Sequence, residues 1–299
     1  MSIFITGAAG FIGGTVAHRL IAAGYAVRGL VRDREKAKRL EAMGIEPVTG
    51  DLDDHDLLVE EARRSDGAIH TADSDHRGAI EALIEGLKGS DKPLLHTSGS
   101  SVIGNDSRGS SLAETAYDED TPMVVVPAKQ WRRDVELRVL AAASEGIRTV
   151  VICPTNIYGS GTGLNPSSVQ VPFLVDQARE SGVVLIVGTG VNRWSNVHIE
   201  DVAELYLLAL QKAPAGAFYF VESGEASFAE IGKAVARRMK LGPVQSWSPE
   251  EAAKRWGERH AYYTLGANSR VHAKRARREL DWKPRHTSIL SWIEKEMPL

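Results

Sequence analysis

The sequence predicts an α/β fold built on a doubly wound parallel sheet, with a smaller C-terminal α/β part. Two observations support this expectation. A short apolar strand, Ile3–Thr6, runs through a glycine-rich turn into the helical stretch Val16–Ala23. Apolar strand-like runs then alternate with helical stretches as far as Thr97. Strands joined by helices need right-handed crossovers, which place the strands parallel in one sheet.

Length, composition and charge are those of an ordinary globular protein. With 299 residues, the chain can form one large or two modest domains around a substantial core. Its net charge of -3 provides no general attraction to nucleic acid or to an anionic membrane, so we expect neither as a partner. Cys153 is the only cysteine and lies in an apolar run, so we expect a buried thiol. A disulfide framework and a cysteine-rich metal site are excluded, and we assign no metal.

No membrane span or export signal is expected, because no apolar run reaches the roughly 18–20 residues that a spanning helix needs. The apolar N-terminal stretch is broken by glycines and has no basic leader. We therefore expect a cytoplasmic protein. A basic cluster at Arg270–Arg278 is interleaved with Ala273 and Ala276, which is typical of a solvated helix face rather than a phosphate-binding patch.

The glycine turn after the first strand predicts a dinucleotide site. Gly7, Gly10 and Gly13 follow one another at spacings of three. The first glycine allows a tight turn, the second lets a pyrophosphate approach the main chain, and the third lets the helix approach the strand. Free N–H groups at the helix start stabilise the phosphate, and we include Phe11 and Ile12 in the site. The alternative is a tight strand-to-helix turn without a ligand.

The end of the second strand, Ala26–Val31, predicts NADP rather than NAD. An acidic residue at this position accepts a hydrogen bond from the ribose 2′-hydroxyl of NAD, whereas an arginine accommodates the 2′-phosphate of NADP. The strand is followed directly by Arg32, and Asp33 comes one residue late. We assign Arg32 to the phosphate, assisted by Arg34 or Lys36. NAD stays the alternative cofactor, and a solvated loop charge the alternative role of Arg32.

The third strand, Pro47–Thr49, follows a helix at Glu35–Met43 and leads into a short acidic segment. Asp51 can accept from the adenine amine, and Leu52 can pack on the adenine ring. Asp51 could equally be the N-cap of the helix predicted over Asp54–Arg64.

The fourth strand, Gly67–His70, ends next to small residues. Thr71 and Ala72 would let the cofactor backbone pass close to the chain, so we assign both to the cofactor site. His70 lies at the strand end, where we expect a structural role rather than a catalytic one.

Seven segments then carry a family resemblance. In chain order they read TGAAGFIGG, GDLDD, HTA, TSGSSVIG, DEDTP, CPTNIYG and NRWSNVHIEDVA. The chain resembles the extended short-chain dehydrogenase/reductases, the superfamily of nucleotide-sugar epimerases, dehydratases and ketone reductases. The resemblance implies a Rossmann domain for NAD(P), residues 1–157 and about 191–213, and a substrate-binding domain, about 158–190 and 214–299. It also implies a homodimer through the helices around Arg77–Leu87 and Lys129–Ser144.

The chain departs from that family at its proton donor. The family uses a tyrosine four residues before a lysine; the tyrosine transfers a proton, and the lysine lowers the pKa of the tyrosine and holds the nicotinamide ribose. None of the seven tyrosines has a lysine at this spacing. Aligned on Glu136, the lysine position holds Arg132 and the tyrosine position Ala128. The register that uses Lys129 instead places Val125 at the tyrosine position.

The serine of the family is altered as well. Aligned on Gly104, its position holds Gly99, flanked by Ser98 and Ser100. These two serines are catalytic candidates, with a polar turn at a strand end as the alternative. Arg132 cannot be a base, but it can stabilise an oxyanion or hold the ribose. Tyr158 is a candidate substitute acid, with packing or substrate contact as the alternative.

Two further residues take their expected places from the resemblance. Pro154 lies near the nicotinamide, and Arg193 meets the substrate. His198 is expected to be a helix cap or a core partner. Beyond these, a strand at Phe218–Val221 and a helix at Phe228–Met239, capped by a serine and a glutamate, are assigned to the substrate-binding part.

Two functional hypotheses follow. The first is an NADP-dependent oxidoreductase or epimerase/dehydratase-like enzyme that acts on a small polar or sugar-like substrate by hydride transfer. The second is a catalytically weak NADP(H)-binding sensor or regulator of the same fold, which the missing tyrosine favours.

Overall fold

A computed structural model describes residues 1–299, and its centre is a seven-stranded sheet. Every neighbouring pair in the sheet is parallel, in the order β10-β6-β5-β4-β1-β2-β3. The strands are β1 (Ser2–Thr6), β2 (Ala26–Val31), β3 (Ile45–Thr49), β4 (Gly67–His70), β5 (Pro93–Thr97), β6 (Arg148–Pro154) and β10 (Ala217–Val221). The predicted doubly wound α/β fold is confirmed.

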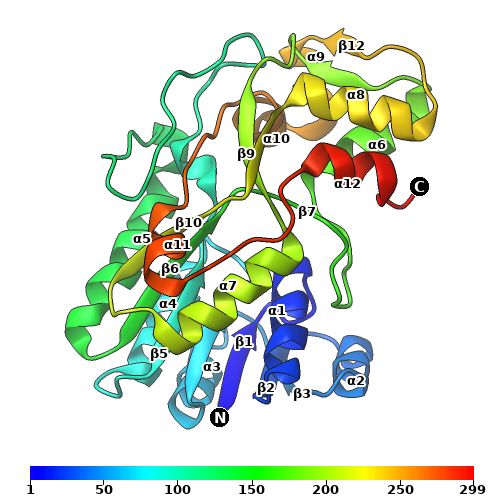
Figure 1. The fold of residues 1–299 in the computed structure, drawn as a ribbon. Helices are drawn as coiled ribbons and strands as arrows, with labels where there is room; N and C mark the ends of the chain where they lie inside the picture. Colours follow the sequence, from blue (N-terminus) through cyan, green and yellow to red (C-terminus); the bar gives the residue numbers. More distant parts are fainter.

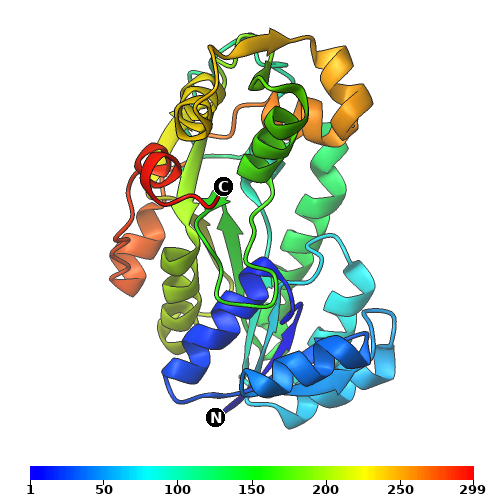
Figure 2. The ribbon, with the colours of Figure 1, turned by 90° about the vertical axis from the view of Figure 1, so that its right-hand side faces the viewer.

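Helices cover both faces of this sheet (Figures 1 and 2). They are α1 (Phe11–Ala22), α2 (Arg34–Ala42), α3 (His55–Arg64), α4 (Arg77–Leu87), α5 (Gln130–Ala141), α7 (Ile199–Lys212) and α11 (Lys274–Leu280). Helices α1, α7 and α11 lie together on one face, and α3, α4 and α5 on the other. The chain leaves β1 toward β2 and β3 and returns on the other side to β4, so a crevice opens beyond the carboxyl ends of β1 and β4.

A smaller body lies beyond the carboxyl ends of the main strands, at the top of Figure 1. It contains the sheet β11-β9-β7 and the strand pair β12-β8. Its elements are β7 (Asn156–Tyr158), α6 (Gln170–Ser181), β8 (Leu185–Val187), β9 (Arg193–His198), β11 (Gly224–Ser227), α8 (Phe228–Met239), β12 (Gln245–Trp247), α9 (Pro249–Trp256), α10 (Glu258–His260) and α12 (Ile289–Lys295). The predicted cap of α8 is a capping box between Ser227 and Glu230.

The position of one strand differs from the expectation. The sequence assigns Phe218–Val221 to the substrate-binding part, but β10 pairs with β6 and completes the main sheet. The reason is burial on both faces: all five residues of β10 are buried, as in the continuous apolar strands of parallel sheets. The other domain boundaries stay a prediction.

The basic cluster contributes to the structure of the C-terminal region. Lys274 pairs with Asp118, Arg275 with Asp120 at 2.6 Å and Arg277 with Glu222 at 2.8 Å. Its charges are therefore neutralised by acidic residues of this chain.

The structure tests two expectations from composition, the burial of the single cysteine and the lack of a membrane-spanning helix. Cys153 is fully buried, as predicted. None of the helices combines the length and the apolar character that crossing a bilayer requires.

Candidate active site

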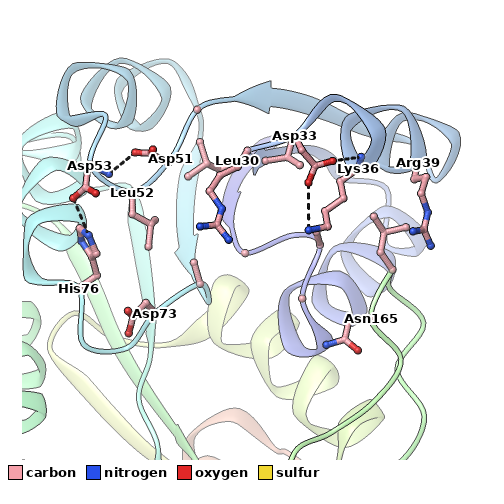
Figure 3. Close-up of a pocket in the computed structure, with 18 residues that line it drawn as sticks. Leu30, Asp33, Lys36, Arg39, Asp51, Leu52, Asp53, Asp73, His76 and Asn165 are labelled. Atoms are coloured by element: carbon pink, nitrogen blue, oxygen red, sulfur yellow. Dashed lines mark hydrogen bonds and ion pairs between the residues drawn. The ribbon is translucent and has the colours of Figure 1, made fainter.

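A cavity of about 650 Å³ lies at the switch point of the main sheet. Its walls are the glycine turn, the end of β2 with the start of α2, the segment after β3 and the loop after β4 (Figure 3). This is where open parallel sheets bind ligands, because the loops at the carboxyl ends of the two central strands diverge.

The glycine turn has the backbone that close ligand approach requires. Gly7 has φ +81°, and a Cβ there would lie 2.7 Å from the backbone nitrogen of Ala72. Gly10 lines the cavity and is the N-cap of α1, whose first-turn amides have no intrahelical acceptor. A Cβ on Gly13 would lie 2.3 Å from the carbonyl oxygen of Gly7, so this glycine allows α1 to pack on the turn and does not line this cavity.

Three cations surround the end of β2. Arg32, Lys36 and Arg39 all line the cavity, and Figure 3 shows Lys36 and Arg39 projecting from α2. Asp33 is the N-cap of α2: its carboxylate accepts from the Lys36 amide at 2.7 Å and lies 3.3 Å from Lys36 Nζ. The amide hydrogen bond and the lysine lower the pKa of Asp33. Arg34 does not line the cavity, so Arg39, and not Arg34, accompanies Lys36.

The opposite wall is the acidic segment after β3. Asp51 and Leu52 line the cavity as predicted. The carboxylate of Asp51 accepts from the Asp53 amide at 2.8 Å, and the N-cap of α3 is Asp54, so the alternative in which Asp51 caps this helix is wrong. Asp53 in turn lies 3.2 Å from His76 Nε2 (Figure 3).

A second cavity, of about 430 Å³, adjoins the first and shares Gly10, Ala72 and Asn165 with it. It lies between the main sheet and the smaller body. Most of the remaining residues assigned to the cofactor or to catalysis line it, namely Phe11, Ile12, Thr71, Ser98, Ser100, Arg132 and Pro154. The two cavities therefore bring together residues from the ends of β1, β4, β5 and β6.

The serines after β5 are buried and hydrogen-bonded. Ser98 donates to the carboxylate of Glu136, and the Ser100 hydroxyl accepts from the Ser269 hydroxyl at 2.7 Å. Burial raises the pKa of Glu136, although Ser98 and Arg133 donate to it. Ser98 is thus oriented by a buried carboxyl group rather than left free in the cavity.

Arg132 is held by a carboxylate that no sequence motif identifies. Its Nε and Nη2 each lie 2.6 Å from an oxygen of Asp75, in the loop after β4, and its Nη1 donates to Ser101 at 3.0 Å. Arg259 of α10 also reaches Asp75, at 3.3 Å. Through these ion pairs, Asp75 links the loop after β4 to α5 and to the smaller body.

Lys129 lies directly before α5, and the sequence offers it only as the alternative lysine of the family motif. Its side chain lines the second cavity and is buried, with 3% exposed. Burial, together with the positive charges of Arg132 and Arg259, lowers its pKa to about 8. A detectable signal was its position three residues before Arg132, which places both residues on neighbouring turns.

Tyr158 does not reach either cavity, so its assignment as a substitute acid is wrong. The side chain is fully buried, with its ring 5.3 Å from that of His198 and 5.8 Å from that of Trp292. Burial raises its pKa. Because side chains alternate along a strand, Ile157 of β7 lines the second cavity and Tyr158 faces the core of the smaller body.

Arg193 lies outside both cavities for the same reason, and its assignment to the substrate stays a prediction. Its guanidinium lies 2.8 Å from Glu225 and 3.2 Å from Glu230, while its neighbour Trp194 lines the second cavity.

The two histidines have the structural roles expected of them. His70 is buried between the Thr6 hydroxyl and the carbonyl of Asp73, at 2.8 and 2.7 Å, and burial lowers its pKa to about 4. His198 caps α7 by accepting from the Glu200 amide at 3.3 Å.

Comparison with known proteins agrees with this architecture. An uncharacterized protein of Schizosaccharomyces pombe is 34% identical over 97% of this chain and 97% of its own length. A Stigmatella aurantiaca protein named 4-hydroxy-2-methyl-3-oxo-4-farnesyl-3,4-dihydroquinoline-1-oxide ketoreductase is 28% identical over 96% of this chain and 93% of its own. The crystal structure of dTDP-glucose 4,6-dehydratase from Bacillus anthracis, in complex with NAD, superposes with a TM-score of 0.77 at 20% identity, covering 99% of this chain and 97% of that one. Residues 3–221 match the model of one family, and the resemblance seen in the sequence is confirmed: the chain belongs to the NAD dependent epimerase/dehydratase family.

Proposed function

We propose that this protein is an NADP-dependent oxidoreductase that transfers a hydride to or from a small carbonyl or alcohol substrate. The observation that carries the proposal is the pair of adjoining cavities at the switch point of the sheet. One is lined by a glycine turn and cations, and the other by buried serines and a buried lysine. Family membership supports a nicotinamide dinucleotide as the cofactor.

The residues of the first cavity fit such a cofactor. Gly7 and Gly10 leave bare main chain beside the free amides of α1, which suits a pyrophosphate. Asp51 and Leu52 are suited to an adenine. Thr71, on the wall of the second cavity, has its hydroxyl engaged with the Thr6 carbonyl at 2.7 Å, so its methyl group is left for packing. When bound, the nicotinamide supplies or accepts a hydride.

The preference for NADP follows from charge. Arg32 and Arg39 form no ion pair within the chain, and both line the first cavity, where a 2′-phosphate would find them. The one carboxylate of this turn, Asp33, is engaged with the α2 amide and with Lys36. It is therefore poorly placed to bind the ribose hydroxyl of NAD.

The second cavity favours a substrate without a diphosphate. Arg193, the arginine expected to meet the substrate, is neutralised by two glutamates and is not free to bind a diphosphate. Arg132 is likewise neutralised by Asp75. We propose that Arg132 positions the segment Ser98–Ser101 through its hydrogen bond to Ser101. The ketoreductase name of one relative agrees with a carbonyl substrate. The smaller body, above all α6 and α10, would cover it.

One observation favours the second candidate, a cofactor-binding sensor with little turnover. No tyrosine lines either cavity, so the usual proton donor of the superfamily is missing. A sensor would need the cofactor site and not the proton donor.

Titration and turnover separate the two candidates. NADPH and NADH are titrated by fluorescence, and the protein is then mixed with NADPH and a panel of ketones, diketones and nucleotide sugars while nicotinamide absorbance is followed. We expect tighter binding of NADPH than of NADH, and turnover of at least one carbonyl compound. Tight NADPH binding without turnover across the panel would favour the sensor, and preference for NADH would contradict the role of Arg32.

A further inference from the structure

The side chain of Lys129 stands apart from every other buried charge in the molecule. The buried carboxylates and guanidinium groups all have partners: Glu61 pairs with Arg28, Arg132 with Asp75, Glu136 accepts from Ser98, Asp201 accepts from backbone amides, and Glu222 pairs with Arg277. Lys129 alone makes no hydrogen bond and no ion pair through its side chain, although only 3% of it is exposed.

Such an arrangement is costly for folding. The Nζ atom still meets the cavity, but an ammonium largely withdrawn from water loses part of its hydration, which a carboxylate or several acceptors normally restore. The groups around Lys129 increase the cost. Arg132 and Arg259 are cationic, and the one nearby carboxylate, Asp75, is engaged by both of them. Methionine would fill the same space without burying a charge. The presence of a lysine here therefore points to a chemical role rather than to packing alone.

The location of Lys129 supplies that function. It ends the short 3₁₀ turn Pro127–Lys129 and precedes α5, the helix on which the superfamily carries its tyrosine. It lines the second cavity together with Ser98, Ser100 and Pro154. An unpaired ammonium therefore borders a cavity that no tyrosine lines.

We propose that Lys129 replaces the tyrosine as the proton donor and acceptor of this enzyme. In reduction, the carbonyl carbon of the substrate gains a hydride from NADPH, which is oxidised, and the C=O π bond opens onto the oxygen. The oxygen takes a proton from Nζ, so that an O–H bond forms, an N–H bond breaks and a neutral amine remains. The amine regains its proton from water. In oxidation each transfer is reversed. This inference rests on the proposed function.

The geometry agrees with the acid–base character that this role requires. With a pKa lowered to about 8, Lys129 exchanges protons near neutral pH, which an ordinary lysine does not. The acid form must be present for reduction, so the rate of reduction is expected to be level below about pH 8 and to fall above it. The rate of oxidation is expected to rise through the same pH.

The first test needs no turnover. The protein is labelled with ¹³C at the lysine Cε and titrated by NMR in the presence of NADP⁺. The resonance that Lys129→Gln removes is expected to titrate near pH 8. Lys233→Gln, at an exposed position on α8, serves as the matched control and removes a resonance that titrates near the usual value of about 10.4. A midpoint near 10.4 for Lys129 would overturn the proposal.

The second test measures single-turnover oxidation of NADPH by a carbonyl compound that the panel identifies. Lys129→Gln and Lys129→Arg are each expected to lower the rate by about 100-fold or more without weakening NADPH binding, while Lys233→Gln leaves it unchanged. Arginine keeps the positive charge but does not release a proton. A wild-type rate in Lys129→Arg would thus show that only charge matters, and Lys129→Met provides a second, near-isosteric variant should arginine perturb folding.

The two proposals fail in different ways. A lysine that titrates near pH 8 in a protein without turnover would refute the oxidoreductase function. It would leave Lys129 without a reaction, and the proton-transfer role would fall with that function. Turnover that survives in Lys129→Gln would refute the role of Lys129 alone.

Discussion

At the scale of single residues, the site is defined by which charges are paired and which are not. Asp33, Arg132 and Arg193 are each engaged by partners in the chain. Arg32 and Lys129 are unpaired, and each lines a cavity. An unpaired charge retains its capacity to bind an ion or to exchange a proton. Substitutions of these two residues therefore test the proposed function most directly.

Arg32→Ala is expected to weaken NADPH binding by about tenfold or more, because a charge-assisted hydrogen bond contributes roughly 1.5–3 kcal/mol. NADH binding should change little, since NADH lacks the 2′-phosphate. Fluorescence titration of both cofactors measures this. Arg34→Ala is the matched control, because Arg34 carries the same charge two residues later and does not line the first cavity. An equal loss for NADH, or full NADPH affinity in Arg32→Ala, would contradict the assignment.

Lys129→Met is expected to raise the free energy of unfolding at pH 7 by about 2 kcal/mol, because it removes a buried, unpaired ammonium. The sign follows from the pKa, which is lowered from 10.5 to about 8 in the folded protein. Between these values the unfolded chain binds the proton and the folded chain does not, so wild-type stability rises with pH in this interval. The variant should lack that rise.

Denaturant unfolding at pH 7 and pH 10 measures both effects. Lys233→Met, at an exposed position, should change stability by less than about 0.5 kcal/mol at either pH. A loss of stability in Lys129→Met at pH 7 would mean that the ammonium has a stabilising partner in solution.

At the scale of secondary-structure elements, alternation along two short strands decides what the substrate can touch. Ile157 of β7 and Trp194 of β9 line the second cavity. Their neighbours Tyr158 and Arg193 therefore face the other side, into the core and toward two glutamates. A family motif can thus be present in the sequence while one of its side chains faces away from the cavity.

The contact between α1 and the glycine turn is the second feature of this scale. Gly13→Ala is expected to lower the free energy of unfolding by about 1–3 kcal/mol, because its Cβ would overlap the Gly7 carbonyl and force α1 away from the turn. Gly78→Ala in α4 is the matched control: its Cβ would meet nothing closer than 3.5 Å, so helix propensity should make it neutral or stabilising. Chemical denaturation compares the two, and equal effects would contradict the close packing.

At the scale of the whole molecule, the prediction concerns assembly. We expect a homodimer in which α4 and α5 pair with their copies. Trp131 and Leu137 on α5 are large apolar side chains that are 42% and 46% exposed. Leu137→Arg is expected to shift the protein toward the monomer in light scattering. Val191→Arg, at an apolar residue that is 41% exposed in a loop of the smaller body, should not. A wild-type monomer would refute the dimer.

Much of the fold was predictable because it depends on local features of the chain. The strands and helices up to β5 follow from apolar periodicity, and the glycine turn follows from backbone freedom and from the space a Cβ would occupy. The residues of the first cavity were predictable for a related reason: the carboxyl ends of parallel strands meet at one edge, so Arg32, Asp51 and Ala72 are neighbours as soon as the sheet is parallel.

The second cavity was less predictable, because its chemistry depends on partners distant in the chain. Asp75 neutralises Arg132 across 57 residues, and Glu225 neutralises Arg193 across 32. Strand β10 joins the main sheet beside β6, a pairing that no local pattern specifies.

By itself, then, the sequence determined the doubly wound sheet, the glycine turn and the cofactor wall, since these depend on periodicity and backbone geometry within short segments. Only the tertiary structure decided which charges stay unpaired in the site, because neutralisation requires two side chains from separate elements to meet. Lys129 is free to exchange a proton for that reason, because no carboxylate from elsewhere in the fold is left to neutralise it.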